Sequence, residues 1–256
     1  MHLLKDGLLF GATGLAGAMN AIAGGGTLLS FPAALAWGLP PQIANATNAL
    51  AVTPGAIASA WTYRRELAPQ RSLVALLTAP TIVGAVLGAA LMRLTPARTF
   101  DAIVPVLVFA ATLALLLQGL ASRRAQAARP PSRARLAVAV AAQLLVGVYG
   151  GYFGAAMGIV MVALFAMLPG DIQSRVGLKN ALAAVANGVA AAYFVASGLV
   201  DPHASLIMVP AGLLGGLVGG HVARRSSPRV VRALIIAIGL GVSALLGYRA
   251  LAIRHV

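Results

Sequence analysis

Two short stretches hold the polar side chains that could bind a ligand in this 256-residue chain. The first stretch contains Asn45, Thr47 and Asn48, and the second contains Lys179 and Asn180, with Asn187 two turns further along. Amides and hydroxyls donate hydrogen bonds to oxyanions without carrying charge, and a lysine adds a positive charge. These residue types predict the binding of a small anion.

A different interpretation of the same residues stays open. Asn45 and Thr47 stand where a helix is expected to begin, so they could cap that helix near the membrane surface. Lys179, like Arg175 before it, could mark a cytoplasmic helix end. The equivalent residues Asn48 and Asn180 and the deeper Asn187 are expected to face an internal cavity.

The composition does not support covalent catalysis. The chain has no cysteine and only five acidic residues, all at predicted helix ends or in loops. No paired carboxylate and no close histidine pair is present, so a nucleophile with a base or a metal cluster is not expected. The sequence predicts a protein that is not an enzyme and needs no cofactor or metal. Intramembrane carboxylates usually serve proton relays and cation sites, so a cation transporter is also disfavoured.

Three consecutive glycines interrupt a hydrophobic run near the start of the chain, and Pro32 follows them. A glycine inside a helix costs about 1 kcal/mol relative to alanine. An interrupted helix leaves N–H groups free at the start of its second half, and these groups attract anions. We therefore expect backbone contacts to an anion at Gly24, Gly25, Gly26, Thr27 and the corresponding Gly154. Glycines spaced by four, such as Gly84 and Gly88, are instead expected to allow close helix packing.

The composition predicts the environment of these elements. The chain is 60% hydrophobic and only 9% charged, whereas a soluble domain has about 25% charged residues. Apolar stretches of about 20 residues, long enough to cross a bilayer, separate the charge clusters. The net charge of +14 lies in short loops, as it does at cytoplasmic helix ends. The lipid bilayer is the expected partner, and nucleic acid is not.

An internal repeat organises the chain. Asn48-Ala-Leu-Ala51 recurs as Asn180-Ala-Leu-Ala183, which is typical of duplicated halves. We expect a first transmembrane repeat over residues 1–120, a basic linker over 121–135 and a second repeat over 136–256. The fold class is an all-α polytopic membrane protein in which each repeat has a glycine-broken helix, forming a helical hairpin, and three transmembrane helices. These segments are expected at 7–38, 43–62, 71–92 and 98–118, and then at 135–168, 174–197, 204–223 and 229–250.

The distribution of basic residues predicts how the halves are oriented. If each broken segment returns to its own side of the membrane, most of the 19 basic residues lie on one face. Because cytoplasmic loops carry the excess of lysine and arginine, this arrangement is favoured over one in which the broken segment crosses. It makes the two repeats inverted, with linker 121–135 in the cytoplasm and both termini outside. Transporters with inverted repeats bind substrate where broken helices meet.

The sequence resembles the sulfite exporter TauE/SafE family from about residue 7 to residue 250. The resemblance rests on Ala23-Gly24-Gly25-Gly26, on Pro32 and on Asn45-Ala-Thr-Asn48 within duplicated halves. It implies a secondary transporter of small sulfur-containing anions, sulfite or organosulfonates, in the bacterial inner membrane. The second half departs from the family pattern, with Gly154-Ala-Ala-Met-Gly158 in place of the triple glycine and Lys179 in place of Thr47.

We interpret the chain as an exporter that works by alternating access and holds the anion at the broken-helix termini between the repeats. The alternatives are an anion channel and a non-transporting membrane scaffold protein. The oligomeric state leaves no trace in the sequence.

Overall fold

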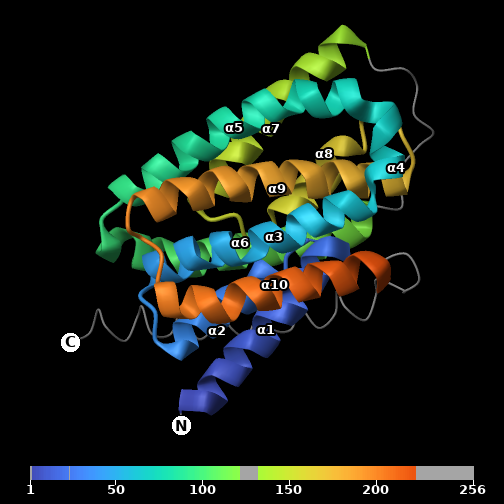
Figure 1. The fold of residues 1–256 in the computed structure, drawn as a ribbon. Helices are drawn as coiled ribbons and strands as arrows, with labels where there is room; N and C mark the ends of the chain where they lie inside the picture. The colour runs from blue at the N-terminus through green and yellow to red at the C-terminus, as the bar shows by residue number, and fades with distance from the viewer. Residues whose placement is uncertain (1, 23, 122–131, 223–256) are drawn as a thin grey trace.

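The computed structural model describes residues 2–22, 24–121 and 132–222, and within them the chain forms helices and no strand. The ribbon in Figure 1 shows these helices, and their bounds agree closely with the expected segments. They are α1 (His2–Ile22), α2 (Thr27–Trp37), α3 (Pro41–Thr62), α4 (Arg64–Leu67), α5 (Arg71–Leu94), α6 (Ala97–Ala121), α7 (Arg133–Tyr152), α8 (Met157–Phe165), α9 (Ile172–Ala196) and α10 (Pro202–Val222). The helix expected at 229–250 and most of the linker lie outside the described residues.

Four stretches in the described part of the chain are long and apolar enough to cross a membrane. Their outward side chains are hydrophobic; on α5, for example, Val83, Leu87 and Leu91 are exposed while Gly84 and Gly88 are buried. A soluble protein rarely exposes a large contiguous apolar surface. The fold is therefore that of a multi-pass helical membrane protein. The four stretches are Arg64–Leu94, Arg133–Tyr152, Ile172–Ala196 and Pro202–Gly219.

Helices α1 and α2 form a hairpin that turns at the glycine break. The indole Nε1 of Trp37, at the end of α2, donates a hydrogen bond of 2.7 Å to Asp6 Oδ1, near the start of α1. Since both residues lie at the open end of the hairpin, α2 returns toward the side from which α1 begins. The Trp37 ring also contacts the His203 ring at the start of α10, with centroids 5.5 Å apart.

Glycines bring helix pairs into backbone contact. Gly84 and Gly88 of α5 lie against the backbone of α7, and a methyl group at Gly88 would overlap the carbonyl of Val148. On the other side of the molecule, α10 lies against α1 and α3 through Gly212 and Gly216. Small residues allow this approach, and dispersion contacts hold helices together where lipid supplies no hydrophobic driving force. The packing role expected for Gly84 and Gly88 is confirmed.

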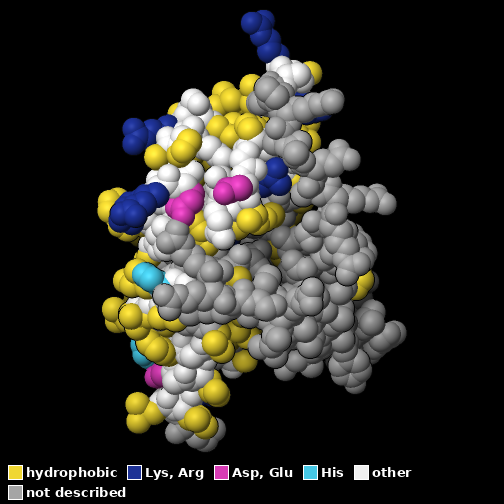
Figure 2. All heavy atoms as spheres, turned by 90° about the vertical axis from the view of Figure 1, so that its right-hand side faces the viewer, with side chains coloured by type: hydrophobic (Ala, Val, Ile, Leu, Met, Phe, Trp, Pro, Cys, Tyr) yellow, Lys and Arg dark blue, Asp and Glu magenta, His cyan; other side chains and the backbone are white. Residues whose placement is uncertain are grey.

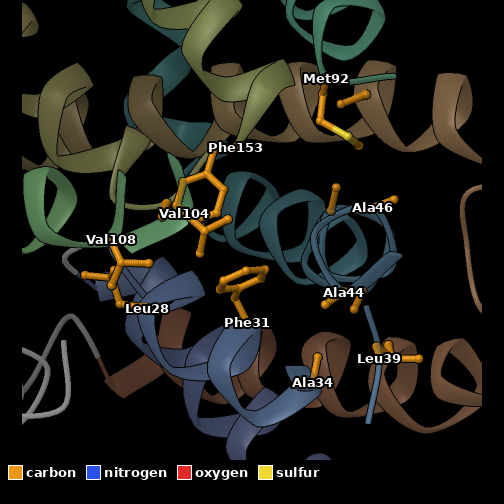
Figure 3. Close-up of a cluster of buried hydrophobic side chains, with 14 of the residues drawn as sticks. Leu28, Phe31, Ala34, Leu39, Ala44, Ala46, Met92, Val104, Val108 and Phe153 are labelled. Atoms are coloured by element: carbon orange, nitrogen blue, oxygen red, sulfur yellow. The ribbon is translucent and has the colours of Figure 1, made fainter. Parts of the chain in front are cut away.

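A hydrophobic core includes the buried side of α2, the short helix that follows the glycine break (Figure 3). Phe31 of α2 packs edge to face against Phe153, with ring centroids 5.2 Å apart. Val104 and Val108 of α6 cover the same cluster, and Leu28 adds a side chain from the first turn of α2. Aromatic pairs of this kind add about 0.5–1.5 kcal/mol beyond their buried area. The core thus fixes the short helix α2 in position.

Basic side chains gather at one end of the molecule. Figure 2 views the end at which Figure 1 shows α4, and basic side chains stand out over the upper part of this face. Arg64 and Arg65 of α4 and Arg71 at the start of α5 are exposed there. Arg64 lies over the ring of Trp61, 5.0 Å from its centroid. A tryptophan with an arginine is typical of the boundary between the bilayer and water.

We predict that Gly88→Ala lowers the thermal stability of the purified protein, because the methyl group meets the Val148 carbonyl. Overpacking costs about 1–3 kcal/mol. Gly11→Ala is the matched control, since nothing lies within 4 Å of a methyl group there, and it should leave stability unchanged or raise it slightly. A melting-temperature measurement of both variants compares them; equal effects would mean that the α5–α7 contact is not close.

Candidate functional site

The break between α1 and α2 uses its three glycines for different physical reasons. Gly24 and Gly25 have φ angles of 80° and 89°, a backbone region in which residues with a side chain are strained. Gly26 has no room for a side chain, because a methyl group would overlap the backbone of Ala16. Its N–H donates to Asn20 Oδ1 at 2.7 Å. The turn therefore needs glycine at each position, and Asn20 satisfies one of the N–H groups that the break exposes.

A second break separates α7 from α8. Gly154 has a φ of 70°, and Ala156 adopts a φ of 58° although it carries a side chain. A left-handed residue other than glycine costs about 1–2 kcal/mol, so this turn stores strain. Residues held in this way persist where the surrounding structure determines them, and they cluster at functional sites.

The two breaks touch each other. A methyl group built at Gly24 would lie 3.1 Å from the Cα and carbonyl carbon of Gly158, in the first turn of α8. Helices α1 and α7 end, and helices α2 and α8 begin, close to this contact between Gly24 and Gly158. Partial charges of both signs thus meet inside the protein, because helix N-termini are positive and C-termini negative.

Side chains from α3 and α9 cap the ends of the broken helices. Lys179 Nζ donates to the carbonyl of Asn20 at 2.5 Å, and Asn180 Nδ2 donates to the carbonyl of Ala21 at 3.4 Å. In the other break, Asn45 Nδ2 donates to the carbonyl of Tyr152 at 3.0 Å. The last carbonyls of a helix have no partner within it. The polar residues singled out in the sequence satisfy these carbonyls at the centre of the fold.

Lys179 is the one basic side chain among these three caps. It is only 1% exposed, and its aliphatic chain lies against Gly158, whose added methyl group would be 2.8 Å from Lys179 Cδ. Its ammonium group makes the hydrogen bond to Asn20, and no carboxylate of the described residues pairs with it. A buried charge without a counter-ion is costly, which marks Lys179 as a candidate binding residue.

Three further candidates have distinct surroundings. Thr27 is buried and begins α2 beside the break. Asn187 is partly exposed, and its Oδ1 lies 3.8 Å from a methyl group built at Gly154, so it faces the second break. Thr47 is placed elsewhere: its hydroxyl accepts a hydrogen bond of 3.0 Å from the N–H of Asp201, in the connection between α9 and α10.

Sequence reasoning missed three polar residues of the site. Asn20 accepts from Gly26 and from Lys179, through its side chain and its carbonyl respectively. Ser30 Oγ donates to Asn48 Oδ1 at 2.5 Å, and the hydroxyl of Tyr149 donates to the carbonyl of Ala155 at 2.5 Å. The signal that could have found Asn20 is an amide in an apolar helix one turn before the glycines.

Arg175 is not a solvated surface charge. It is 8% exposed, and its guanidinium donates to the carbonyl of Leu168 at 3.4 Å, between α8 and α9. Gln70 donates to the neighbouring carbonyl of Pro169 at 3.3 Å. Arg175 and Gln70 therefore hold the connection that follows α8, at the basic end of the molecule.

Two of the acidic residues, Asp171 and Asp201, serve as helix caps, in agreement with their expected places at helix ends. Asp171 begins α9, and the hydrogen bond from the backbone N–H of Ser174 holds the pKa of its carboxyl below the usual value. Asp201 accepts from the N–H of Ala204 at the start of α10 at 2.7 Å. The described residues contain no group of His, Cys, Asp and Glu that could hold a metal ion.

Comparison with known proteins identifies a family and several relatives. The family described as "Sulfite exporter TauE/SafE" matches residues 9–246. The chain is 30% identical over 243 residues to "Probable membrane transporter protein YfcA" of Escherichia coli, which covers 94% of this chain and 89% of that protein. It is 23% identical to "Probable membrane transporter protein" of Haemophilus influenzae, with 94% of each chain covered. It is 28% identical to "Probable membrane transporter protein ORF9" of Sinorhizobium sp., over 94% of this chain and 91% of that protein. No solved structure matches.

We predict that Gly24→Ala destabilises the protein more than Gly25→Ala. Both glycines have positive φ and share the backbone penalty, but a methyl group at Gly24 meets the backbone of Gly158, whereas at Gly25 it meets the flexible end of Ile159. The difference between the variants therefore isolates the contact between the breaks. The melting temperatures of the two variants measure this difference. An equal decrease in both would show that Gly24 does not lie close to the backbone of Gly158.

Proposed function

Because this chain belongs to the sulfite exporter TauE/SafE family and is a membrane transporter of that type, we propose that it exports small sulfur-containing anions, sulfite or organosulfonates, across the bacterial inner membrane. The family description supports the substrate class. The observation that carries the proposal within this chain is the buried Lys179 at the meeting point of two broken helices.

In the proposed site, the anion lies beside Lys179 and Asn180, where α2 and α8 begin. An ammonium group has three hydrogen-bond donors, and Lys179 uses one of them on Asn20. The amides of Asn48 and Asn187 and the backbone at the breaks supply further donors. The full set of proposed binding residues is Gly24, Gly25, Gly26, Thr27, Asn45, Thr47, Asn48, Gly154, Lys179, Asn180 and Asn187. Thr47 would act at the outer end of α3, near Asp201.

We further propose that the chain consists of two inverted repeats, residues 1–120 and 136–256, joined by a cytoplasmic linker over 121–135. The hydrogen bond from Trp37 to Asp6 supports a hairpin that returns to its own side. The packing of α1 on α10 and of α7 on α5 supports an exchange of equivalent contacts between the halves. The basic face in Figure 2 supports the assignment of the α4 end to the cytoplasm.

Alternating access is the proposed mechanism. The caps from Lys179 to Asn20 and from Asn45 to Tyr152 each join one half of the chain to the other. Breaking one set of such bonds while the other holds would open the site to one side at a time. The close approach of Gly24 to Gly158 supports the proposal of a transporter over that of an open channel.

Anion binding is tested first by thermal stability in detergent. We expect sulfite or a sulfonate to raise the melting temperature, because a ligand at 100 times its dissociation constant stabilises a protein by about 2.7 kcal/mol. Chloride at equal ionic strength is the control and should have no effect. A folded protein that responds to none of the sulfur oxyanions would contradict the proposed substrate class.

The orientation is tested with single cysteines, since the natural chain contains none. Ser72 stands at the start of α5 and Ser197 at the end of α9. In intact cells, an impermeant thiol reagent should label Ser197→Cys, and it should label Ser72→Cys only after the membrane is opened. Labelling of both from outside would refute the inverted arrangement.

A further inference from the structure

We propose that the site selects anions of a single negative charge over dianions, an inference that rests on the proposed function. The argument concerns the charge that the protein places at the meeting point of the broken helices. Methanesulfonate and hydrogensulfite belong to the selected class, and sulfate and thiosulfate belong to the rejected one.

Among the described residues, the break holds one basic side chain with no carboxylate bonded to it, that of Lys179. Its side chain is 1% exposed, and its ammonium group meets a carbonyl oxygen and no carboxylate. The acidic residues nearest in sequence, Asp171 and Asp201, cap α9 and α10 through the N–H groups of Ser174 and Ala204. Both carboxylates accept hydrogen bonds at helix ends, and neither is bonded to the Lys179 ammonium group.

The helix ends add little net charge. Each half-helix end carries about half an elementary charge, positive at an N-terminus and negative at a C-terminus. Helices α1 and α7 end where α2 and α8 begin, so two positive and two negative ends meet and offset one another. The site therefore keeps the single charge of Lys179.

The repeat supplies no second lysine. Thr47 stands at the position in the first half that Lys179 occupies in the second, and its hydroxyl is bonded to Asp201. Arg175 lies one helical turn before Lys179, but its guanidinium reaches the carbonyl of Leu168 beyond the end of α8. The cation at the break thus has no equivalent partner from the other half.

One buried cation favours a monoanion for a simple electrostatic reason. The cost of removing an ion from water rises with the square of its charge, whereas its attraction to a single lysine rises only in proportion to that charge. A monoanion leaves the occupied site neutral, and a dianion leaves a net negative charge inside the membrane protein. Such an uncompensated charge is costly at low dielectric.

Methanesulfonate and methylphosphonate test this inference because they share a tetrahedral shape and a methyl group. Methanesulfonate carries one charge throughout the neutral range, whereas methylphosphonate carries one at mildly acidic pH and two at alkaline pH. We expect both to bind the purified full chain at acidic pH. At alkaline pH, methylphosphonate should bind about tenfold or more weakly relative to methanesulfonate. Methanesulfonate at the same pH corrects for any change in the protein itself.

Three variants assign the effect to Lys179. Lys179→Gln keeps a donor for the Asn20 carbonyl but removes the charge, and it should weaken methanesulfonate binding roughly 30-fold or more. Lys179→Arg keeps the charge and should keep the preference for the monoanion. Arg175→Gln removes an equal charge one turn away and should also keep that preference. Melting temperatures without ligand establish that each variant is folded.

The outcomes separate this inference from the proposed function. Tight binding of dianionic methylphosphonate, or loss of the preference in Arg175→Gln alone, would overturn the assignment to Lys179 while anion binding stands. Failure of sulfite and of both probes to bind the folded wild-type protein would refute the anion site itself.

Discussion

The rest of the structure depends on one constraint: a helix interrupted inside a membrane protein exposes backbone groups that water cannot reach. Each such group costs several kcal/mol in hydrocarbon unless the protein satisfies it. The breaks after α1 and α7 create these groups at the centre of the fold. Asn20, Asn45, Lys179, Asn180 and Tyr149 satisfy them. The polar residues of this apolar chain are thus explained first as partners of the broken helices.

Close packing makes this arrangement possible. The breaks can touch only because Gly24 and Gly158 have no side chains, and α1 and α7 can reach that point only because glycines let α10 and α5 lie against them. In a bilayer, where apolar burial does not drive helices together, such contacts and the hydrogen bonds across them hold the halves in place. The aromatic pair of Phe31 and Phe153 adds a hydrophobic contact between α2 and the residue that follows α7 (Figure 3).

The caps also connect structure to transport. Lys179 stabilises the end of α1 with a charge, and Asn45 stabilises the end of α7 with a neutral amide. The two ends of the site are therefore chemically different although the halves share one plan. In the proposed site, an anion that attracts the Lys179 ammonium would compete with the Asn20 carbonyl for it. The proposed substrate binding would then be coupled to the contact between the halves through one side chain.

The sequence by itself determined the membrane environment, the two breaks and the residues around them. Composition, apolar length and three adjacent glycines are local properties, and they act wherever the chain folds. The tertiary structure decided which partner each polar group meets. Lys179 and Asn20 lie 159 residues apart, and Asn45 and Tyr152 lie 107 apart. Thr47 accepts a hydrogen bond from Asp201 and does not contact a break residue through its hydroxyl. Asn20 and Ser30 belong to the candidate site although no sequence pattern predicted them. No local pattern records these pairs, because the packing of distant helices creates them.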